Sequence, residues 1–103
     1  MLFRRLKYAL EGRSPLWNKT RKKHLKENPN CCACETIYNL EVHHIKPFEF
    51  YPDLELEPTN LITLCEYCHL VLGHFKNFRT YNPYVVVDSL FYRSNKKNNA
   101  KIT

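Results

Sequence analysis

The stretch Asn60-Leu61-Ile62-Thr63-Leu64-Cys65-Glu66-Tyr67-Cys68-His69 decides how this chain of 103 residues folds. It joins a short apolar run, expected to be a strand, to a Cys-x-x-Cys pair expected to open a helix. A two-residue gap lets both thiolates of a pair bind one ion, and two pairs complete a tetrahedral four-sulfur site. A second such pair lies upstream. The sequence therefore predicts a structural zinc site with the ligands Cys31, Cys34, Cys65 and Cys68.

This ion is expected to stabilise the fold rather than to react, because four thiolates leave no open position for water. Between the pairs lie 30 residues, more than the roughly 15–20 of a plain zinc ribbon. The longer insertion indicates that it carries a further function. Iron bound by four cysteines, as in a rubredoxin-like electron carrier, is an alternative. Cys32 is left over and is expected to be a packed or half-exposed thiol.

The charge of +6 is unevenly distributed along the chain. Residues 1–30 carry +7, residues 31–74 carry −6 and residues 75–103 carry +5. Basic ends around an acidic, histidine-rich centre suit a protein whose ends grip a polyanion while its centre holds a cation. The alternative is that these charges only keep two helices soluble.

Composition favours one small folded domain, because hydrophobic residues make up 44% of the chain. No apolar run approaches the roughly 20 residues of a membrane helix, and the N-terminus lacks the pattern of a secretory signal. A cytoplasmic location without a membrane partner is therefore expected. The expected domain covers residues 1–94, followed by a disordered tail over residues 95–103. Its basic helical part, zinc knuckle with insertion, and C-terminal part cover residues 1–30, 31–74 and 75–94.

The local patterns predict a mixture of helices and short strands, so the fold class is α+β. A helix is expected over residues 2–10, and a second begins at Ser14-Pro15 and runs to about Glu27. Trp17 on this second helix is expected to be a core anchor. The other expected elements are strands over residues 40–45 and 60–64, a helix over residues 65–74 and a short helix from Asn82-Pro83 through Tyr92. The run of three valines at residues 85–87 left a strand open as the alternative for the last element.

Four of the five histidines lie between His43 and His74. Cleavage of a phosphodiester at neutral pH needs a base for the attacking water and positive charge on the phosphate and the leaving oxygen. Adjacent residues of a strand point to opposite faces, so one of His43 and His44 can bind a metal while the other stays free as a base. His69 opens the following helix and is expected to point back at the strand. His24 lies on the basic helix and is expected to be a surface residue.

Together, the two cysteine pairs, the His43-His44-Ile45 strand and the segment from Asn60 to His69 resemble the zinc-containing branch of the HNH endonucleases. The resemblance covers about residues 31–74, and the flanking segments are similar to small stand-alone HNH proteins of phages or bacteria. It implies a small ββα-metal core of the His-Me finger, treble-clef-like kind. In such a core a hairpin and a helix hold one divalent ion, here with basic N-terminal helices and a short C-terminal helix around it.

The resemblance also implies roles for individual residues. His44 matches the general base, and His43 matches a metal-ligand position that many members fill with aspartate. Asn60 matches the central asparagine, which either ties the loop or reaches the metal region, and His69 matches the ligand on the helix. His74 stays open as a further ligand. Five residues of an α-helix turn it by about 140°, away from the ligand face, unless the helix ends at Gly73.

The leading prediction is therefore a DNA endonuclease with a structural zinc and one catalytic ion, which is magnesium, manganese, nickel or zinc. His44 is expected to take a proton from water, while the ion at His43 and His69 neutralises phosphate charge. Contacts with DNA phosphates are expected from Arg21, Lys22, Lys23, Lys26, Lys46 and Arg79, with help from the Lys96-Lys97 tail. A transient dimer and phage packaging or defence proteins are candidate partners. The main rival is a zinc knuckle that binds nucleic acid without cutting it.

Overall fold

The computed structural model describes residues 13–102, so the helix expected over residues 2–10 lies outside the described part. Its helices and strands are α2 (Trp17–Glu27), β1 (Leu40–His44), β2 (Leu61–Cys65), α3 (Glu66–Cys68), the π-helix η3 (His69–Gly73) and α4 (Val85–Ile102). The loop between the strands contains two 3-10 turns, η1 (Pro52–Leu54) and η2 (Pro58–Asn60). The predicted α+β class is confirmed.

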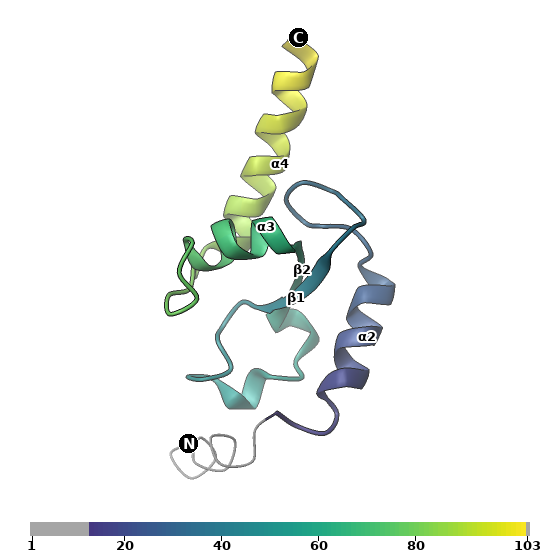
Figure 1. Cartoon of the computed structure of the whole chain (residues 1–103), viewed down its shortest axis with the longest axis vertical. Coiled ribbons are helices and arrows are strands. Elements are labelled where there is room, and N and C mark those ends of the chain that lie inside the picture. Colours follow the sequence, from purple (N-terminus) through teal and green to yellow (C-terminus); the bar gives the residue numbers. More distant parts are fainter. Residues whose placement is uncertain (1–12, 103) are drawn as a thin grey trace.

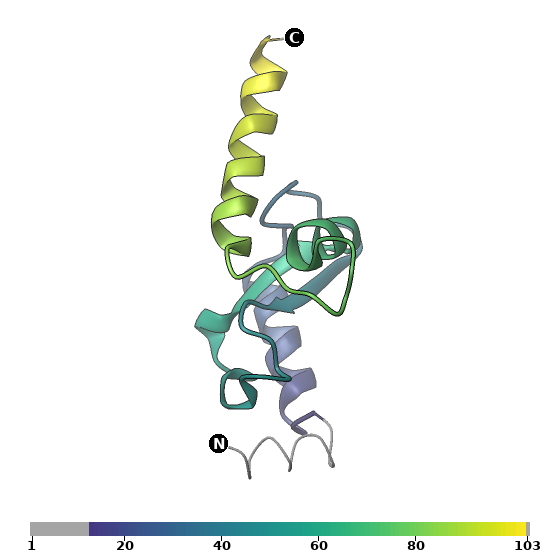
Figure 2. The ribbon, with the colours of Figure 1, turned by 90° about the vertical axis from the view of Figure 1, so that its left-hand side faces the viewer.

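The centre of the molecule is an antiparallel hairpin of β1 and β2, in which His43 pairs with Ile62 and His44 with Leu61. All five residues of β2 are buried, and four of them are apolar, whereas β1 alternates between apolar and polar residues. Helix α2 lies on one side of the hairpin, and α3 with η3 lies on the other (Figures 1 and 2). His44 of β1 therefore faces α2, and His43 faces η3.

The hydrophobic core is small and lies around the cysteines. Its buried members are Cys31, Ala33, Ile62, Leu64, Cys65, Cys68 and Val85. Three of these residues are thiols of the two Cys-x-x-Cys pairs. Apolar burial alone is therefore modest in the described part of the chain, and an ion bound by the thiols would add the stability that such a small core lacks.

Helix α2 begins later than its sequence pattern predicts. Ser14 accepts a hydrogen bond from the backbone of Leu16 through its Oγ, but Pro15 and Leu16 form a turn and the helix begins at Trp17. Its predicted end at Glu27 is confirmed, and the Asn28 backbone N–H donates to the His24 carbonyl there.

The C-terminal element corrects two expectations. Helix α4 runs from Val85 to Ile102, so neither a strand nor a short helix ending near Tyr92 is present. It also continues through most of the segment expected to be a disordered tail. No glycine or proline occurs between Val85 and Ile102 to end the helix. Asn82 starts it by accepting a hydrogen bond from the Tyr84 backbone N–H through Oδ1. None of the helices described here is long and apolar enough to cross a membrane.

Candidate metal centres and active-site cleft

The four paired cysteines converge at one point of the core. Cys31 and Cys34 lie in the turn after α2, Cys65 ends β2 and Cys68 ends α3. Their sulfur atoms all lie within 4.8 Å of one another, and the Sγ atoms of Cys34 and Cys65 are 3.7 Å apart. All five cysteines are free thiols. The geometry therefore suits four ligands of one ion.

Each Cys-x-x-Cys turn directs a backbone N–H at its first sulfur. The Cys34 N–H donates to Cys31 Sγ at 3.4 Å, and the Cys68 N–H donates to Cys65 Sγ at the same distance. Burial alone raises the pKa of the Cys31 thiol, but the hydrogen bond from the Cys34 N–H and other hydrogen bonds outweigh it and lower that pKa to about 7. Burial and the neighbouring thiols raise the pKa of Cys68. Only a cation would let all four become thiolates together.

A second cluster consists of three imidazoles. His43 comes from β1, and His69 and His74 come from the two ends of η3. Each pair of ring centroids is 4.8 Å apart, and the facing Nε2 atoms of His69 and His74 are 3.1 Å apart. One nitrogen of each ring lies within 4.8 Å of the others. The three histidines thus offer one ion three nitrogen ligands.

The π-helix explains why His74 belongs to this cluster. Residues five apart diverge on an α-helix but lie much nearer to one face on a π-helix, whose hydrogen bonds run from i to i+5. The segment ends sharply at Phe75 and Lys76, which both have left-handed backbone angles, with φ of 51° and 66°. The helical segment ends at Gly73, which is the condition under which His74 is expected to stay available as a further ligand.

Two oxygen atoms orient the helix-borne imidazoles. Nδ1 of His69 lies 3.4 Å from Oε1 of Glu41, which is on the same face of β1 as His43. Nδ1 of His74 lies 2.6 Å from the carbonyl oxygen of Thr80. If each Nδ1 carries the proton, each Nε2 presents its lone pair to the centre of the cluster. Neither Glu41 nor Thr80 was predicted, because the sequence does not show what a ligand's second nitrogen contacts.

His43 is the most buried of the three clustered histidines, with an exposure of 3%. Its Nε2 has no hydrogen-bond partner among the described residues. Burial and, to a lesser extent, the other histidines lower its pKa to about 3, so the ring is neutral at pH 7. A side chain at Gly73 would place its Cβ 3.2 Å from His43 and from His69. The absence of a side chain there lets the rings approach, and a buried neutral imidazole with an unpartnered nitrogen fits a metal ligand.

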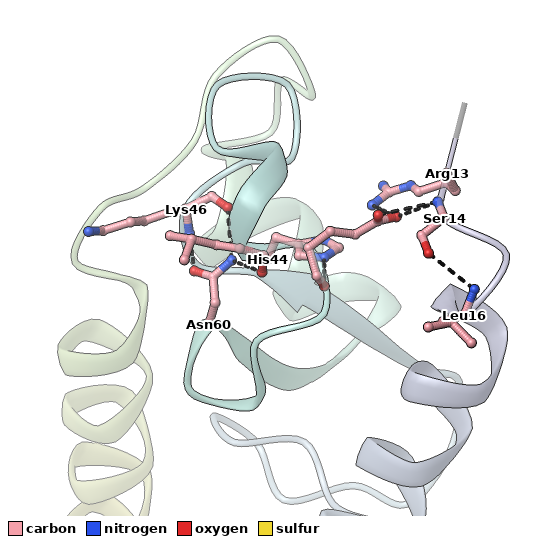
Figure 3. A network of polar contacts seen from close by, with 8 residues as sticks. Arg13, Ser14, Leu16, His44, Lys46 and Asn60 are labelled. Carbon is pink, nitrogen blue, oxygen red and sulfur yellow. Dashed lines mark hydrogen bonds and ion pairs between the residues drawn. The ribbon is translucent and has the colours of Figure 1, made fainter. Parts of the chain in front are cut away.

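His44 is held apart from this cluster on the α2 side of the hairpin. Its ring packs on Trp17 with 4.5 Å between centroids, and its Nε2 lies 2.9 Å from the Glu55 carbonyl oxygen (Figure 3). Burial lowers its pKa. Trp17, expected to anchor the core, is instead half-buried and supports this histidine.

One cleft of about 280 Å³ reaches both sides of the hairpin. It is lined by His43, His69 and His74 of the cluster, by His44, and by Arg13, Val42, Pro47, Phe48 and Glu49. The histidine cluster is thus accessible, whereas the cysteine cluster lies in the core. The arrangement suits a reaction on a group that reaches the ion and His44 at once.

Asn60 is buried at the end of the interstrand loop and ties that loop together. Its side chain accepts a hydrogen bond from the Lys46 backbone N–H and donates to the carbonyls of Lys46 and Leu54 (Figure 3). Asn60 does not line the cleft. Of the two roles that the resemblance implied, the contacts match the tying of the loop.

The predicted DNA contacts lie outside the cleft. Lys22, Lys23 and Lys26 are exposed on α2, as is Arg79 in the loop after His74, whereas Arg21 is half-buried. Lys46 is exposed and directs its Nζ over the Tyr51 ring, 5.5 Å from the centroid. His24 is half-buried rather than on the surface. Cys32 is half-buried, as expected.

The comparisons with known proteins agree with this geometry. A hairpin and a following helix that surround a histidine cluster, next to a four-cysteine site, fit the ββα-metal fold. A family model described as HNH endonuclease matches residues 29–75. This is nearly the same segment, residues 31–74, whose motifs resemble that family in the sequence. Over these residues the chain is similar to the HNH endonucleases. No curated protein and no solved structure matches the chain significantly.

Proposed function

We propose that this protein is a metal-dependent endonuclease that hydrolyses DNA phosphodiester bonds, with His44 as general base. The observation that carries the proposal is the shared cleft: a buried, neutral His44 and three converging imidazoles open onto the same space. An HNH endonuclease domain accounts for a nuclease in general. The residue roles and the choice of DNA are the proposal.

His44 is set up to remove a proton from water. Its Nε2 donates to the Glu55 carbonyl, so Nδ1 keeps a lone pair for a proton. The lowered pKa keeps the ring neutral at pH 7 and therefore ready to act as a base. The stacked Trp17 restricts the ring. In this proposal Nδ1 takes the proton of a water molecule that attacks the phosphorus.

The proposed ligands of the catalytic ion are His43, His69 and His74. Three neutral nitrogen ligands suit zinc, nickel or manganese better than magnesium, which prefers oxygen. Three protein ligands leave a position open for a phosphate oxygen or water. When bound, the ion supplies positive charge at the scissile phosphate and at the departing 3′ oxygen.

The proposed occupant of the cysteine cluster is structural zinc. The four sulfur atoms lie close enough together to bind one ion, and zinc prefers four such ligands in a tetrahedron. Elemental analysis of the purified protein tests this assignment, and iron with visible absorption would replace it. The exposed lysines Lys22, Lys23 and Lys26 of α2 are proposed to contact DNA phosphates without reading sequence.

The test is a supercoiled-plasmid nicking assay with added zinc, nickel, manganese or magnesium. We expect nicking by the wild-type protein and at least a 100-fold loss in His44→Ala. His24→Ala is the matched control, because this histidine lies outside the cleft. Equal rates for His44→Ala and the wild type would refute the base assignment. DNA binding without nicking under every metal would instead support the non-catalytic zinc knuckle.

A further inference from the structure

Arg13 is the only cationic side chain among the described residues that line the cleft, and Glu49 is the only acidic one. A phosphodiester that enters the cleft therefore meets one fixed positive charge from the protein itself. That charge lies on the segment before α2, which the sequence did not mark as part of the site.

The Arg13 guanidinium is held by two aromatic rings. Its carbon atom lies 4.6 Å from the centroid of Phe48 and 5.2 Å from that of Trp17, the ring that also packs on His44. Such contacts fix the planar group while leaving N–H donors at its edge. With 47% of the side chain exposed, Arg13 is restrained but still accessible.

Glu55 joins Arg13 to His44. The Glu55 side chain is 1% exposed; its carboxylate lies 3.8 Å from Arg13 Nη1 and accepts from the Ser14 backbone N–H, while its backbone carbonyl faces His44 Nε2. Figure 3 shows Arg13 and Ser14 on one side of this network and His44 on the other. One residue thus sets the position of both the cation and the base.

We propose that Arg13 binds a non-bridging oxygen of the DNA phosphate at His44 and so positions that phosphate for attack; this inference rests on the proposed nuclease function. Guanidinium presents a planar fork of N–H donors that matches a phosphate, which a lysine ammonium does not. Arg13 then contacts the substrate directly, in addition to its ion pair with Glu55. If Arg13 served only to hold Glu55 in place, the three measurements below would give different results.

The first measurement needs no variant and no cleavage. The Nε–H resonance of Arg13 is followed by ¹⁵N–¹H NMR in the zinc-loaded protein, without other added divalent ions, as a short DNA duplex is titrated. We expect a saturable shift of this resonance that is reversed by salt. An unmoved Arg13 resonance, while α2 lysine signals shift, overturns the proposal even if the protein nicks DNA. A shift in a protein that never nicks DNA would keep the phosphate contact and reject the nuclease.

The second measurement compares nicking by Arg13→Met, Arg13→Lys and the matched control Lys19→Met, an exposed cation of α2 outside the cleft. We expect Arg13→Met to lower kcat/KM about 10- to 100-fold, Arg13→Lys to recover only part of it, and Lys19→Met to change it about twofold or less. Thermal unfolding of each variant is recorded alongside. Equal losses in Arg13→Met and Lys19→Met contradict the proposal.

The third measurement assigns the contact to one phosphate. A duplex with a mapped nicking position carries a single uncharged methylphosphonate at each phosphate next to that position in turn. Each change alone should lower the nicking rate. At the phosphate that Arg13 binds, the two losses should not add, so Arg13→Met lowers the rate on the modified duplex only slightly further. Full additivity at every position would mean that Arg13 acts only through the fold.

Discussion

The cysteine cluster and the histidine cluster share one hairpin but differ in access. Three of the four cysteines are buried, and their sulfurs meet inside the core. Two of the three clustered histidines are half-buried, and all three line an open cleft. Four ligands complete a tetrahedral site, whereas three leave a position for a reactant. The same small fold thus separates a site suited to stability from a site suited to chemistry.

The largest effect that this comparison predicts is at a cysteine. Cys65→Ser removes a thiolate from the core, and because metal binding by such small domains is itself folding free energy, we expect cooperative unfolding to be lost or greatly weakened. The measurement is thermal unfolding followed by circular dichroism, together with zinc content. Cys32→Ser is the matched control, since Cys32 is outside the cluster. A folded, zinc-free Cys65→Ser protein would show that the core stands without an ion.

A second prediction concerns the open cluster. His74→Ala leaves two imidazoles, so affinity for zinc or nickel added beyond the structural ion should fall by more than 100-fold, while the protein stays folded. Calorimetric titration measures the affinity, and circular dichroism checks the fold. Unchanged affinity would place His74 outside the site. Unfolding would contradict the division between the two clusters.

A smaller effect is expected at Glu41, which contacts His69 rather than an ion. Glu41→Gln keeps the size but removes the charge beside Nδ1, so metal affinity should fall about 10- to 100-fold. The same titration measures the loss, with Glu66→Gln on α3 as the control, because Glu66 is not part of the cluster. Equal affinities in the two variants would show that the carboxylate does not orient His69.

The smallest effect is expected at Asn60. Asn60→Ala leaves backbone groups of Lys46 and Leu54 without their partner, which should cost about 1–3 kcal/mol of unfolding free energy. Urea unfolding measures this cost. The loop that Asn60 ties also contains Glu55, whose carbonyl contacts the proposed base His44. We therefore expect Asn60→Ala to lower the nicking rate by a larger factor than it lowers the zinc content. An Asn60→Ala protein with lower zinc content and an unchanged nicking rate would show that the loop supports the cysteine cluster rather than His44.

Much of the fold could be predicted because its signals are local. The Cys-x-x-Cys spacing, the apolar run of β2 and the paired histidines each depend on neighbours in sequence. They predicted the hairpin and the segment that the HNH model matches.

The rest of the site depends on distant contacts or on unusual backbone. The role of His74 stays open in the sequence because an α-helix would turn it away from the ligand face, and no residue type marks the π-helix that brings it to the cluster. Glu55 sits in an acidic loop that appears solvated in the sequence, yet it is buried beside Ser14 and Arg13. Long-range pairing of this kind is invisible to periodicity and spacing.

The adjacency of Cys68 and His69 has a consequence for how the protein is assembled. The last thiol of one cluster and the first imidazole of the other are joined by a single peptide bond at the junction of α3 and η3. We therefore expect the cysteine cluster to bind its ion first, because that ion would fix the helix start from which His69 extends. Protein made without zinc is then expected to bind added divalent ions weakly at the histidine cluster.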